Sequence, residues 1–189
     1  KTMRASFYVL GPLISRFGRV NVSLPGGCAW GPRPVDYHLK GFEKLGAKLN
    51  LKGGNILAEA KELIGSEIYF EFPSVGATGN LAMAAAKAKG VTKLYNCAKE
   101  PEIIQLCQFL NSMGAKIEGV GTENLIIHGV NELHPSDIEI IPDRIEAGTF
   151  LIAGALLGKI KLTDVNPKHL DTVTEKLTEV GTSIEFDSN

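Results

Sequence analysis

The sequence has little cysteine, almost no net charge and no long apolar run, and each shortage excludes a class of protein. Three cysteines in 189 residues are too few, and odd in number, for a disulfide framework. Twenty Lys and Arg against 21 Asp and Glu give a formal charge of −1, so the basic excess that drives binding to nucleic acid or to a membrane surface is missing. Binding of small anions at local clusters stays open.

The sequence also lacks the signals of membrane, secreted and metal proteins. No apolar run approaches the roughly 20 residues that span a bilayer, and the chain does not begin with a signal-peptide pattern, so we expect a soluble, cytoplasmic protein. The four histidines and three cysteines form neither a His-x-x-x-His nor a Cys-x-x-Cys pattern, and no nucleophile elbow is present. We therefore expect no metal, no cofactor and no serine-hydrolase site.

Glycine is the residue in excess, and it recurs at regular intervals. The chain has 21 glycines in 189 residues, about 11%, against roughly 7% in average proteins. Glycines typical of helix ends recur at Gly18, Gly90 and Gly158, glycines that precede a predicted strand at Gly46, Gly114 and Gly181, and prolines suited to a first helical turn at Pro34, Pro101 and Pro167. Successive members of each set are 66 to 72 residues apart, which predicts a tandem repeat of about 67 residues.

Each repeat predicts the same order of elements, in which helices alternate with strands. Strands are expected at residues 19–24, 47–52, 55–60 and 67–72, then at 91–95, 115–119, 124–130 and 137–141, and finally at 159–163 and 182–187. This indicates an α/β or α+β chain built from βαβαββ units. The first unit lacks its leading strand and the third lacks its closing hairpin, so we expect the chain to be part of a longer one.

The first repeat carries extra residues in one loop. Pro34 follows Gly18 by 16 residues, whereas the two later repeats have 11 and 9 residues at this point. The surplus falls in Leu-Pro-Gly-Gly-Cys-Ala-Trp-Gly-Pro-Arg-Pro, residues 24–34, and an insertion that the repeat does not need is a candidate functional loop. Cys28 in this loop is the candidate reactive thiol, with a merely exposed thiol as the alternative. Cys97 and Cys107 are expected to be core thiols.

The starts of three helices are the other candidate sites. Ser74, Val75 and Gly76 begin a small-residue helix, which is either an anion site or simply a well-capped packing helix. Asp143 and Glu146 fit the N-cap and first-turn acid of a later helix. Arg4 at the start of the first helix is unfavourable for the helix dipole, and is a candidate anion ligand or a solvated charge.

The helix start at Ser74 nearly matches the fingerprint of dinucleotide-binding proteins, Gly-x-Gly-x-x-Gly. Gly76 and Gly79 fit the pattern, but Ser74 replaces the first glycine and Asn96 replaces the acid that is expected about twenty residues later. A dinucleotide-binding module is therefore kept as a lesser alternative.

Several of these segments together resemble the enolpyruvyl transferases, in particular the family that acts on UDP-N-acetylglucosamine. They are Leu24-Pro-Gly-Gly-Cys28-x-x-Gly-Pro-Arg33-Pro34-Val35-Asp36-x-His38, Arg4-Ala5-Ser6, Ser74-Val75-Gly76-Ala77-Thr78 and residues 100–103 and 142–149. The resemblance runs over the whole chain and implies an inside-out α/β barrel of repeated βαβαββ units, incomplete here at both ends. Residues 1–141 would belong to the catalytic domain, and residues 142–189 would begin a second domain.

The resemblance also implies an activity and the residues for it. The activity is transfer of the enolpyruvyl group of phosphoenolpyruvate to the 3-hydroxyl of UDP-N-acetylglucosamine, with release of phosphate, in bacterial peptidoglycan synthesis. Cys28 matches the cysteine that is implicated in protonating the enolpyruvate methylene and that fosfomycin alkylates, and Arg4 and Arg33 match ligands of phosphoenolpyruvate. The sugar nucleotide would bind at Arg33, Pro34, Val35, Asp36, Tyr37, Ser74, Val75 and Gly76, supported by His38, Glu100, Glu102, Asp143, Arg144 and Glu146.

Two departures qualify what this resemblance implies. Phe72 stands where some members have a lysine directed at the diphosphate. Other residues of the family's active site lie outside this chain, so the remainder of the parent chain is an expected partner and the segment alone should have negligible turnover. A non-catalytic relative that binds UDP-sugars is the main alternative.

Overall fold

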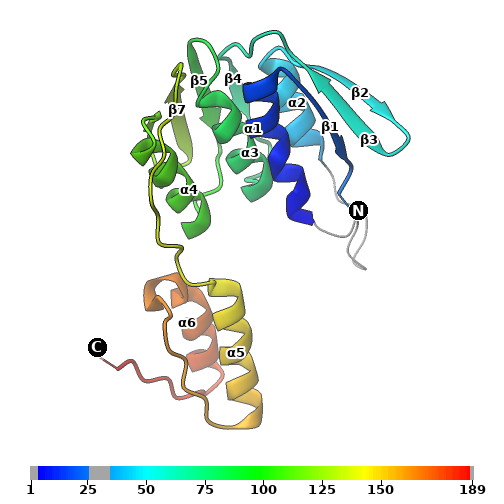
Figure 1. Ribbon diagram of the computed structural model, residues 1–189. Coiled ribbons are helices and arrows are strands. Elements are labelled where there is room, and N and C mark those ends of the chain that lie inside the picture. The colour runs from blue at the N-terminus through cyan, green and yellow to red at the C-terminus, as the bar shows by residue number, and fades with distance from the viewer. Residues whose placement is uncertain (1–3, 26–34, 188–189) are drawn as a thin grey trace. The chain divides into compact units, whose positions relative to one another are not determined.

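A computed structural model describes residues 4–25 and 35–187, and the chain divides into two compact units, Lys1–Ile138 and Glu139–Asn189 (Figure 1). The assignment of residues 1–141 to a catalytic domain and of 142–189 to a second domain stays a prediction. No helix in the described ranges combines the length and the apolar composition that a membrane crossing requires.

The first unit contains two copies of one chain path. The first copy consists of a 3₁₀ helix η1 (Arg4–Val9), α1 (Leu10–Phe17), β1 (Arg19–Ser23), α2 (Asp36–Lys44), β2 (Lys48–Lys52) and β3 (Asn55–Glu59). The second consists of β4 (Glu67–Tyr69), α3 (Val75–Ala85), β5 (Val91–Tyr95), α4 (Pro101–Ser112), β6 (Lys116–Glu118) and β7 (Asn124–His128). The predicted repeat is confirmed, and the second copy has the full βαβαββ order.

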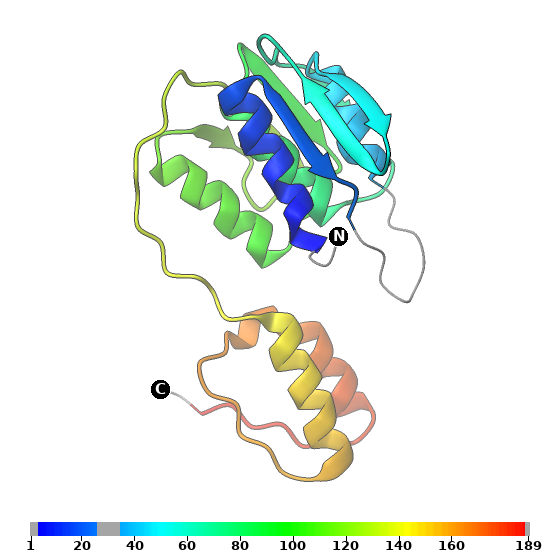
Figure 2. The same cartoon turned by 45° about the vertical axis from the view of Figure 1, so that its right-hand side comes forward.

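The two sheets have the same internal order. The strand orders are β1-β3-β2 and β4-β5-β7-β6, so the last strand of each repeat lies between the other two and is antiparallel to both. β4 adds a parallel edge strand beside β5. Alternate residues face the core, as period-2 burial requires; Val20 and Val22, for example, are buried opposite Ala58 and Ile56. In Figure 2 the β1-β3-β2 sheet lies beside α1.

Helix α3 is the centre of this unit. It packs against α1, α2 and α4, and eight of its eleven residues are buried. The helix is made almost entirely of small and apolar residues on every side, which is typical of a helix with no solvent face. Three neighbouring helices can therefore approach it closely, and its N-terminal turn is held in a fixed position among them.

Glycine ends most of the helices as predicted, with one exception. Gly46, Gly114 and Gly181 follow α2, α4 and α6 with φ angles of 90°, 98° and 90°, a region that residues with a Cβ rarely occupy. The predicted helix end at Gly90 is wrong, since α3 ends at Ala85. The backbone of Lys89 instead exchanges hydrogen bonds with Leu63 and Gly65, at 2.7 and 2.8 Å, and a helix continued to residue 89 would prevent them.

The second unit contains α5 (Arg144–Leu157), a short 3₁₀ helix η2 (Pro167–His169) and α6 (Asp171–Glu179), but no strand among its described residues. The strands predicted at 137–141, 159–163 and 182–187 are therefore wrong. In the first unit β1 and β2 do not pair with each other, because both pair with β3 between them. The extended segments of the second unit have no such central strand to join among its described residues.

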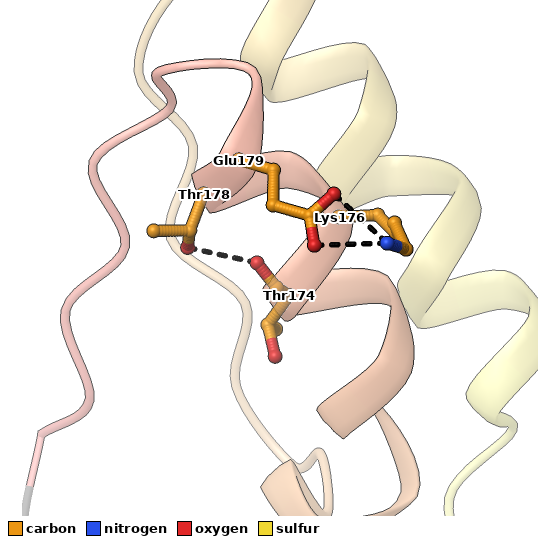
Figure 3. Close-up of polar contacts among 4 residues, drawn as sticks. All are labelled: Thr174, Lys176, Thr178 and Glu179. Atoms are coloured by element: carbon orange, nitrogen blue, oxygen red, sulfur yellow. Dashed lines mark hydrogen bonds and ion pairs between the residues drawn. The ribbon is translucent and has the colours of Figure 1, made fainter.

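The second unit also buries few apolar side chains. Its buried hydrophobic residues in the described range are Ala147 and Leu170, whereas Leu156 and Leu157 of α5 are 78% and 88% exposed. On α6, the Nζ of Lys176 lies 2.8 Å from both carboxylate oxygens of Glu179, and the hydroxyl of Thr178 donates to the carbonyl of Thr174 at 2.8 Å (Figure 3). Exposed pairs of this kind stabilise a helix by about 0.5 kcal/mol or less, so they do not replace a core.

Candidate functional site

The predicted site residues fall into three groups by where the structure places them. Cys28, Arg33 and Pro34 lie outside the described residues, and of Arg4 the structure describes the backbone, at the start of η1. Val35, Asp36 and Tyr37 lie at the start of α2, and Ser74, Val75 and Gly76 at the start of α3. Asp143, Arg144 and Glu146 lie in the second unit, at the start of α5.

The start of α3 is capped by a side chain, and the first N–H groups of the helix remain without a partner inside the helix. Ser74 is the N-cap, and its Oγ accepts a 3.3 Å hydrogen bond from the backbone N–H of Ala77. This confirms the structural interpretation of Ser74 as a helix cap. The backbone N–H groups of Val75 and Gly76, in the first turn, have no acceptor within the helix. Such groups, at the positive end of the helix dipole, suit an anion.

Tyr8 of η1 fixes this turn from the neighbouring segment, although no motif in the sequence points to it. Its hydroxyl donates a 3.0 Å hydrogen bond to the carbonyl of Val75. Burial, followed by the charges of Glu102 and Glu100, raises the pKa of Tyr8 to about 12, so the phenol remains protonated and able to donate. The charges of Glu100 and Glu102, two of the predicted supporting residues, therefore act on Tyr8.

A second connection runs through the side-chain amide of Asn80, which is completely buried. Its Oδ1 accepts from the backbone N–H of Gly11 at 2.7 Å, and its Nδ2 lies 3.0 Å from the carbonyl of Phe7 and 3.1 Å from Nδ1 of His38. One side chain on α3 therefore joins η1, α1 and α2. The sequence offered one clue to this role: Asn80 is the only asparagine in an alanine-rich helix, and a buried amide must form hydrogen bonds.

His38 occupies a buried position between these segments. It is 8% exposed, and its ring packs edge-on against Phe7, with centroids 4.9 Å apart and an interplanar angle of 82°. Burial lowers the pKa of His38 to about 4, although Asp36 opposes the shift, so the ring is neutral near pH 7. The other ring nitrogen, Nε2, faces the start of α3, because a Cβ added to Gly76 would lie 3.1 Å from it.

The first turn of α2 presents the remaining predicted residues of the first unit. Tyr37 packs edge-on against Phe70, with ring centroids 6.1 Å apart, and lines a surface hollow of about 590 Å³ together with Lys40 and Lys44. Asp36 forms a long ion pair of 3.9 Å with Lys40, and both side chains are exposed. A hollow of this size and exposure does not by itself define a binding site.

Asp143 of the second unit has a structural role. Its Oδ1 accepts hydrogen bonds from the backbone N–H groups of Ile145 and Glu146 at 2.8 and 3.1 Å. This is the N-cap geometry that the sequence predicted for Asp143, with Glu146 as the acid of the first turn.

The cysteines of the second repeat are core residues, as predicted. Cys97 and Cys107 are each 1% exposed. Burial raises the pKa of Cys97 to about 12 and that of Cys107 to about 11, so neither forms the reactive thiolate near neutral pH.

Three kinds of polar group thus lie together at the start of α3. They are the first backbone N–H groups of the helix, the neutral imidazole of His38 and the neutral phenol of Tyr8. Over residues 4–25 and 35–187, no three His, Cys, Asp or Glu side chains gather in a way that would hold a metal ion.

Comparison with known sequences identifies the family of this chain and several similar relatives. The chain matches the family described as EPSP synthase (3-phosphoshikimate 1-carboxyvinyltransferase) over residues 1–189. It is 58% identical over 187 residues to a UDP-N-acetylglucosamine 1-carboxyvinyltransferase of Chloroherpeton thalassium, covering 97% of this chain and 44% of that protein. The corresponding protein of Thermodesulfovibrio yellowstonii is 54% identical, with coverages of 98% and 45%. The chain therefore spans less than half the length of these relatives.

Comparison with solved structures gives the same fold. The enolpyruvyl transferase NikO from Streptomyces tendae superimposes with a TM-score of 0.83 at 25% identity, over 99% of this chain and 46% of that one. EPSP synthase from Acinetobacter baumannii gives 0.65 at 18% identity, over 93% and 41%. The predicted enolpyruvyl transferase fold is confirmed, although the sheets of the described residues do not close into a barrel.

Proposed function

The chain belongs to the EPSP synthase family, and on this premise we propose that it is part of a UDP-N-acetylglucosamine enolpyruvyl transferase. The observation that carries the proposal is the identity of 51–58% to four curated relatives with that specificity in their names, over nearly all of this chain. The enzyme would transfer the enolpyruvyl group of phosphoenolpyruvate to the sugar 3-hydroxyl and release phosphate. We assign this reaction to bacterial peptidoglycan synthesis in the cytoplasm.

Cys28 is the proposed catalytic acid. In the addition step the thiol proton of Cys28 would pass to the methylene carbon of phosphoenolpyruvate. The sugar 3-hydroxyl would give its proton to a base in the remainder of the parent chain, and its oxygen would bond to the adjacent carbon, giving a tetrahedral ketal. A proton of the new methyl group would then return to the Cys28 thiolate as phosphate leaves, which restores the double bond. A thiol pKa of about 8.5, lowered somewhat by a nearby arginine such as Arg33, suits a group that must hold and release a proton near neutral pH.

The anionic substrates would be held by guanidinium groups and backbone N–H groups. Arg4 and Arg33 are the proposed ligands of phosphoenolpyruvate, because a guanidinium pairs with phosphate or carboxylate through two parallel hydrogen bonds. Arg33 and Pro34 would enclose the uracil ring, with Val35, Asp36 and Tyr37 along its edge. The diphosphate would lie at Ser74, Val75 and Gly76, where the free N–H groups of α3 support anion binding.

Phe72 makes the backbone donors more important in this chain. Its side chain is exposed beside the start of α3, and it brings no positive charge to the diphosphate. We therefore propose that the N–H groups of the α3 turn supply most of the affinity for that part of the ligand.

Alkylation by fosfomycin tests the proposed function. The chain is incubated with fosfomycin, with and without UDP-N-acetylglucosamine, and the modified peptides are mapped by mass spectrometry. We expect modification at Cys28, promoted by the sugar nucleotide, while the buried Cys97 and Cys107 serve as internal controls and stay unmodified.

A titration with UDP-N-acetylglucosamine, followed by amide NMR signals of residues 35–37 and 74–76, completes the test. NAD is the matched control ligand. Shifts with the sugar nucleotide and alkylation of Cys28 support the proposal. Binding without alkylation would indicate a non-catalytic relative, and shifts with NAD alone would indicate a dinucleotide-binding module.

A further inference from the structure

The hydrogen bonds around Asn80 determine where the proton of His38 lies. The backbone N–H of Gly11 can only donate, so the atom of Asn80 that it contacts at 2.7 Å must be the amide oxygen. The other amide atom, Nδ2, then carries two hydrogens, and its two neighbours at 3.0 and 3.1 Å are the carbonyl of Phe7 and Nδ1 of His38. Nδ1 must accept, so the neutral ring carries its proton on Nε2.

This protonated nitrogen is directed at the N-terminal turn of α3. No hydrogen bond joins Nε2 to another described residue. His38 as a whole is 8% exposed, and Nε2 is not one of the completely buried polar atoms that lack a partner. The position of a Cβ on Gly76 would be 3.1 Å from Nε2, closer than ordinary van der Waals contact. Glycine at position 76 thus keeps the space between the ring and the helix end free of a side chain.

We propose that His38 binds a phosphate-type oxygen at the start of α3 through its Nε2–H group, and that Asn80 is the positioning residue that fixes this tautomer. The proposal rests on the proposed function insofar as the oxygen would belong to the diphosphate of the sugar nucleotide. His38 then adds a side-chain donor to the backbone N–H groups of Val75 and Gly76.

The chemistry of the site favours an anion with several acceptor oxygens. The groups that the proposal assigns to the ligand are donors: two backbone N–H groups and one imidazole N–H, at the positive end of the helix dipole. The nearest carboxylate known to act on His38 is that of Asp36, which opposes the lowering of its pKa. The imidazole is held neutral, so it acts by hydrogen bonding and not by charge, and it cannot rotate to offer an acceptor without breaking the bond from Asn80. A neutral or cationic ligand group would leave these donors without acceptors.

The tautomer is tested first, because that measurement does not depend on the activity. Long-range ¹H–¹⁵N correlation spectra of the 189-residue chain report which ring nitrogen of His38 carries the proton. We expect the Nε2–H form in the wild type. In Asn80→Asp the carboxylate cannot donate to Nδ1, so we expect the proton to move to Nδ1. A wild-type ring protonated on Nδ1 would overturn the inference and leave the proposed function untouched.

Binding is then tested with uridine, UDP and inorganic pyrophosphate as probes, on two variants of His38. Asparagine places its oxygen near the position of Nδ1, so His38→Asn keeps an acceptor for Asn80 but loses the outer donor. Glutamine reaches the position of Nε2 and can restore a donor there. We expect UDP and pyrophosphate to bind about tenfold more weakly to His38→Asn, the size of one lost hydrogen bond to a charged group, and His38→Gln to recover part of the loss. Uridine affinity should be equal in all three proteins.

The outcomes separate the two proposals. Equal UDP affinity in the wild type and His38→Asn, with no movement of the His38 ¹⁵N signals, would refute the role of His38 but not the enzyme assignment. Binding of pyrophosphate through His38 without any binding of UDP would support the anion site and count against the nucleotide specificity. If neither UDP nor pyrophosphate binds, both proposals fail at this site.

Discussion

The hydroxyl of Tyr8 donates a 3.0 Å hydrogen bond to the carbonyl of Val75, and this contact joins residues 67 positions apart in the chain. It connects η1, which begins at Arg4, to the turn at the start of α3. Two segments with proposed ligands of anionic substrates are thereby held to each other. The bond acts at the backbone, so it sets the direction of the turn independently of the side chain of Val75.

Replacing Tyr8 by Phe should weaken both stability and binding. Loss of the hydroxyl leaves the half-buried carbonyl of Val75 without this donor, and we expect the free energy of unfolding in urea to fall by about 1 kcal/mol. Affinity for UDP-N-acetylglucosamine should fall as well, because the turn is less well fixed. Tyr69→Phe is the matched control. Tyr69 is 68% exposed and its 3.3 Å hydrogen bond to Glu67 is on the surface, so we expect almost no change in the free energy of unfolding or in the affinity. Equal effects of the two substitutions would contradict the role of Tyr8.

The stability of the first unit should depend on pH through His38. Its pKa is about 4 in the folded chain and about 6.5 in the unfolded chain. Between these values the unfolded state binds more protons, so the stabilisation is complete above pH 6.5 and is lost as the pH falls toward 4. We expect the free energy of unfolding to decrease by roughly 2 kcal/mol from pH 7 to pH 5 for this group.

Urea unfolding at the two pH values measures this change. His38→Asn should abolish the decrease in the free energy of unfolding between pH 7 and pH 5 that His38 causes. His134→Asn, at an exposed histidine of the same unit, should leave that decrease unchanged. An unchanged pH dependence in His38→Asn would show that the ring is not buried in its neutral form.

The two core thiols should be unreactive in the folded chain. Because Cys97 and Cys107 are buried and their pKa values are raised, we expect neither to react with a disulfide reagent such as DTNB at pH 7.5 within minutes. In denaturing urea both should react at once. The Cys28→Ser variant isolates their behaviour, and fast reaction of this variant under native conditions would contradict the buried positions.

Two helical glycines should respond oppositely to alanine. A Cβ on Gly11 of α1 would overlap the backbone and side-chain oxygens of Asn80, whereas a Cβ on Gly148 of α5 would meet Val173 at an ordinary 3.7 Å. Gly11→Ala should therefore destabilise the chain by about 1–3 kcal/mol through overpacking. Gly148→Ala should be neutral or raise the helical content, because alanine favours a helix by up to about 1 kcal/mol over glycine. Thermal unfolding followed by circular dichroism measures both.

The sequence predicted the repeat and most of its elements, because helix ends and hydrophobic periodicity are local features. Gly18, Gly46 and Gly114 have the backbone conformations that their positions indicated. The predicted strands of the third repeat failed because a strand requires a partner, and pairing is not a local property. The helix end at Gly90 failed for a related reason: the backbone around Lys89 bonds to residues 63 and 65, and nothing in the neighbouring sequence indicates this.

The candidate site was predictable to a smaller extent. The starts of α2 and α3 were found from their residue types. The cap interpretation of Asp143 is confirmed, and so is the cap interpretation of Ser74, while the anion site that was the other interpretation of Ser74 stays a prediction. Tyr8 and Asn80 were not found, since their importance depends on contacts with residues 42 to 73 positions away. The role of the glycines was also predicted only in part from the sequence. Beyond ending helices, Gly11 and Gly41 lie where α1 and α2 touch Asn80 and Leu81 of α3, so they allow the close approach of helices.

The central position of α3 has a consequence for how the chain folds. The hydrogen bonds that tie the first repeat to α3 span 67, 69, 73 and 42 residues. Contacts between residues so far apart in the chain form late in folding, because a long loop must be closed before they can stabilise the folded state. During synthesis η1, α1 and α2 leave the ribosome before the helix that covers them. We therefore expect the start of α3 to reach its place in the same step that completes the core, so that no folding intermediate has a stable first repeat and an unformed anion site.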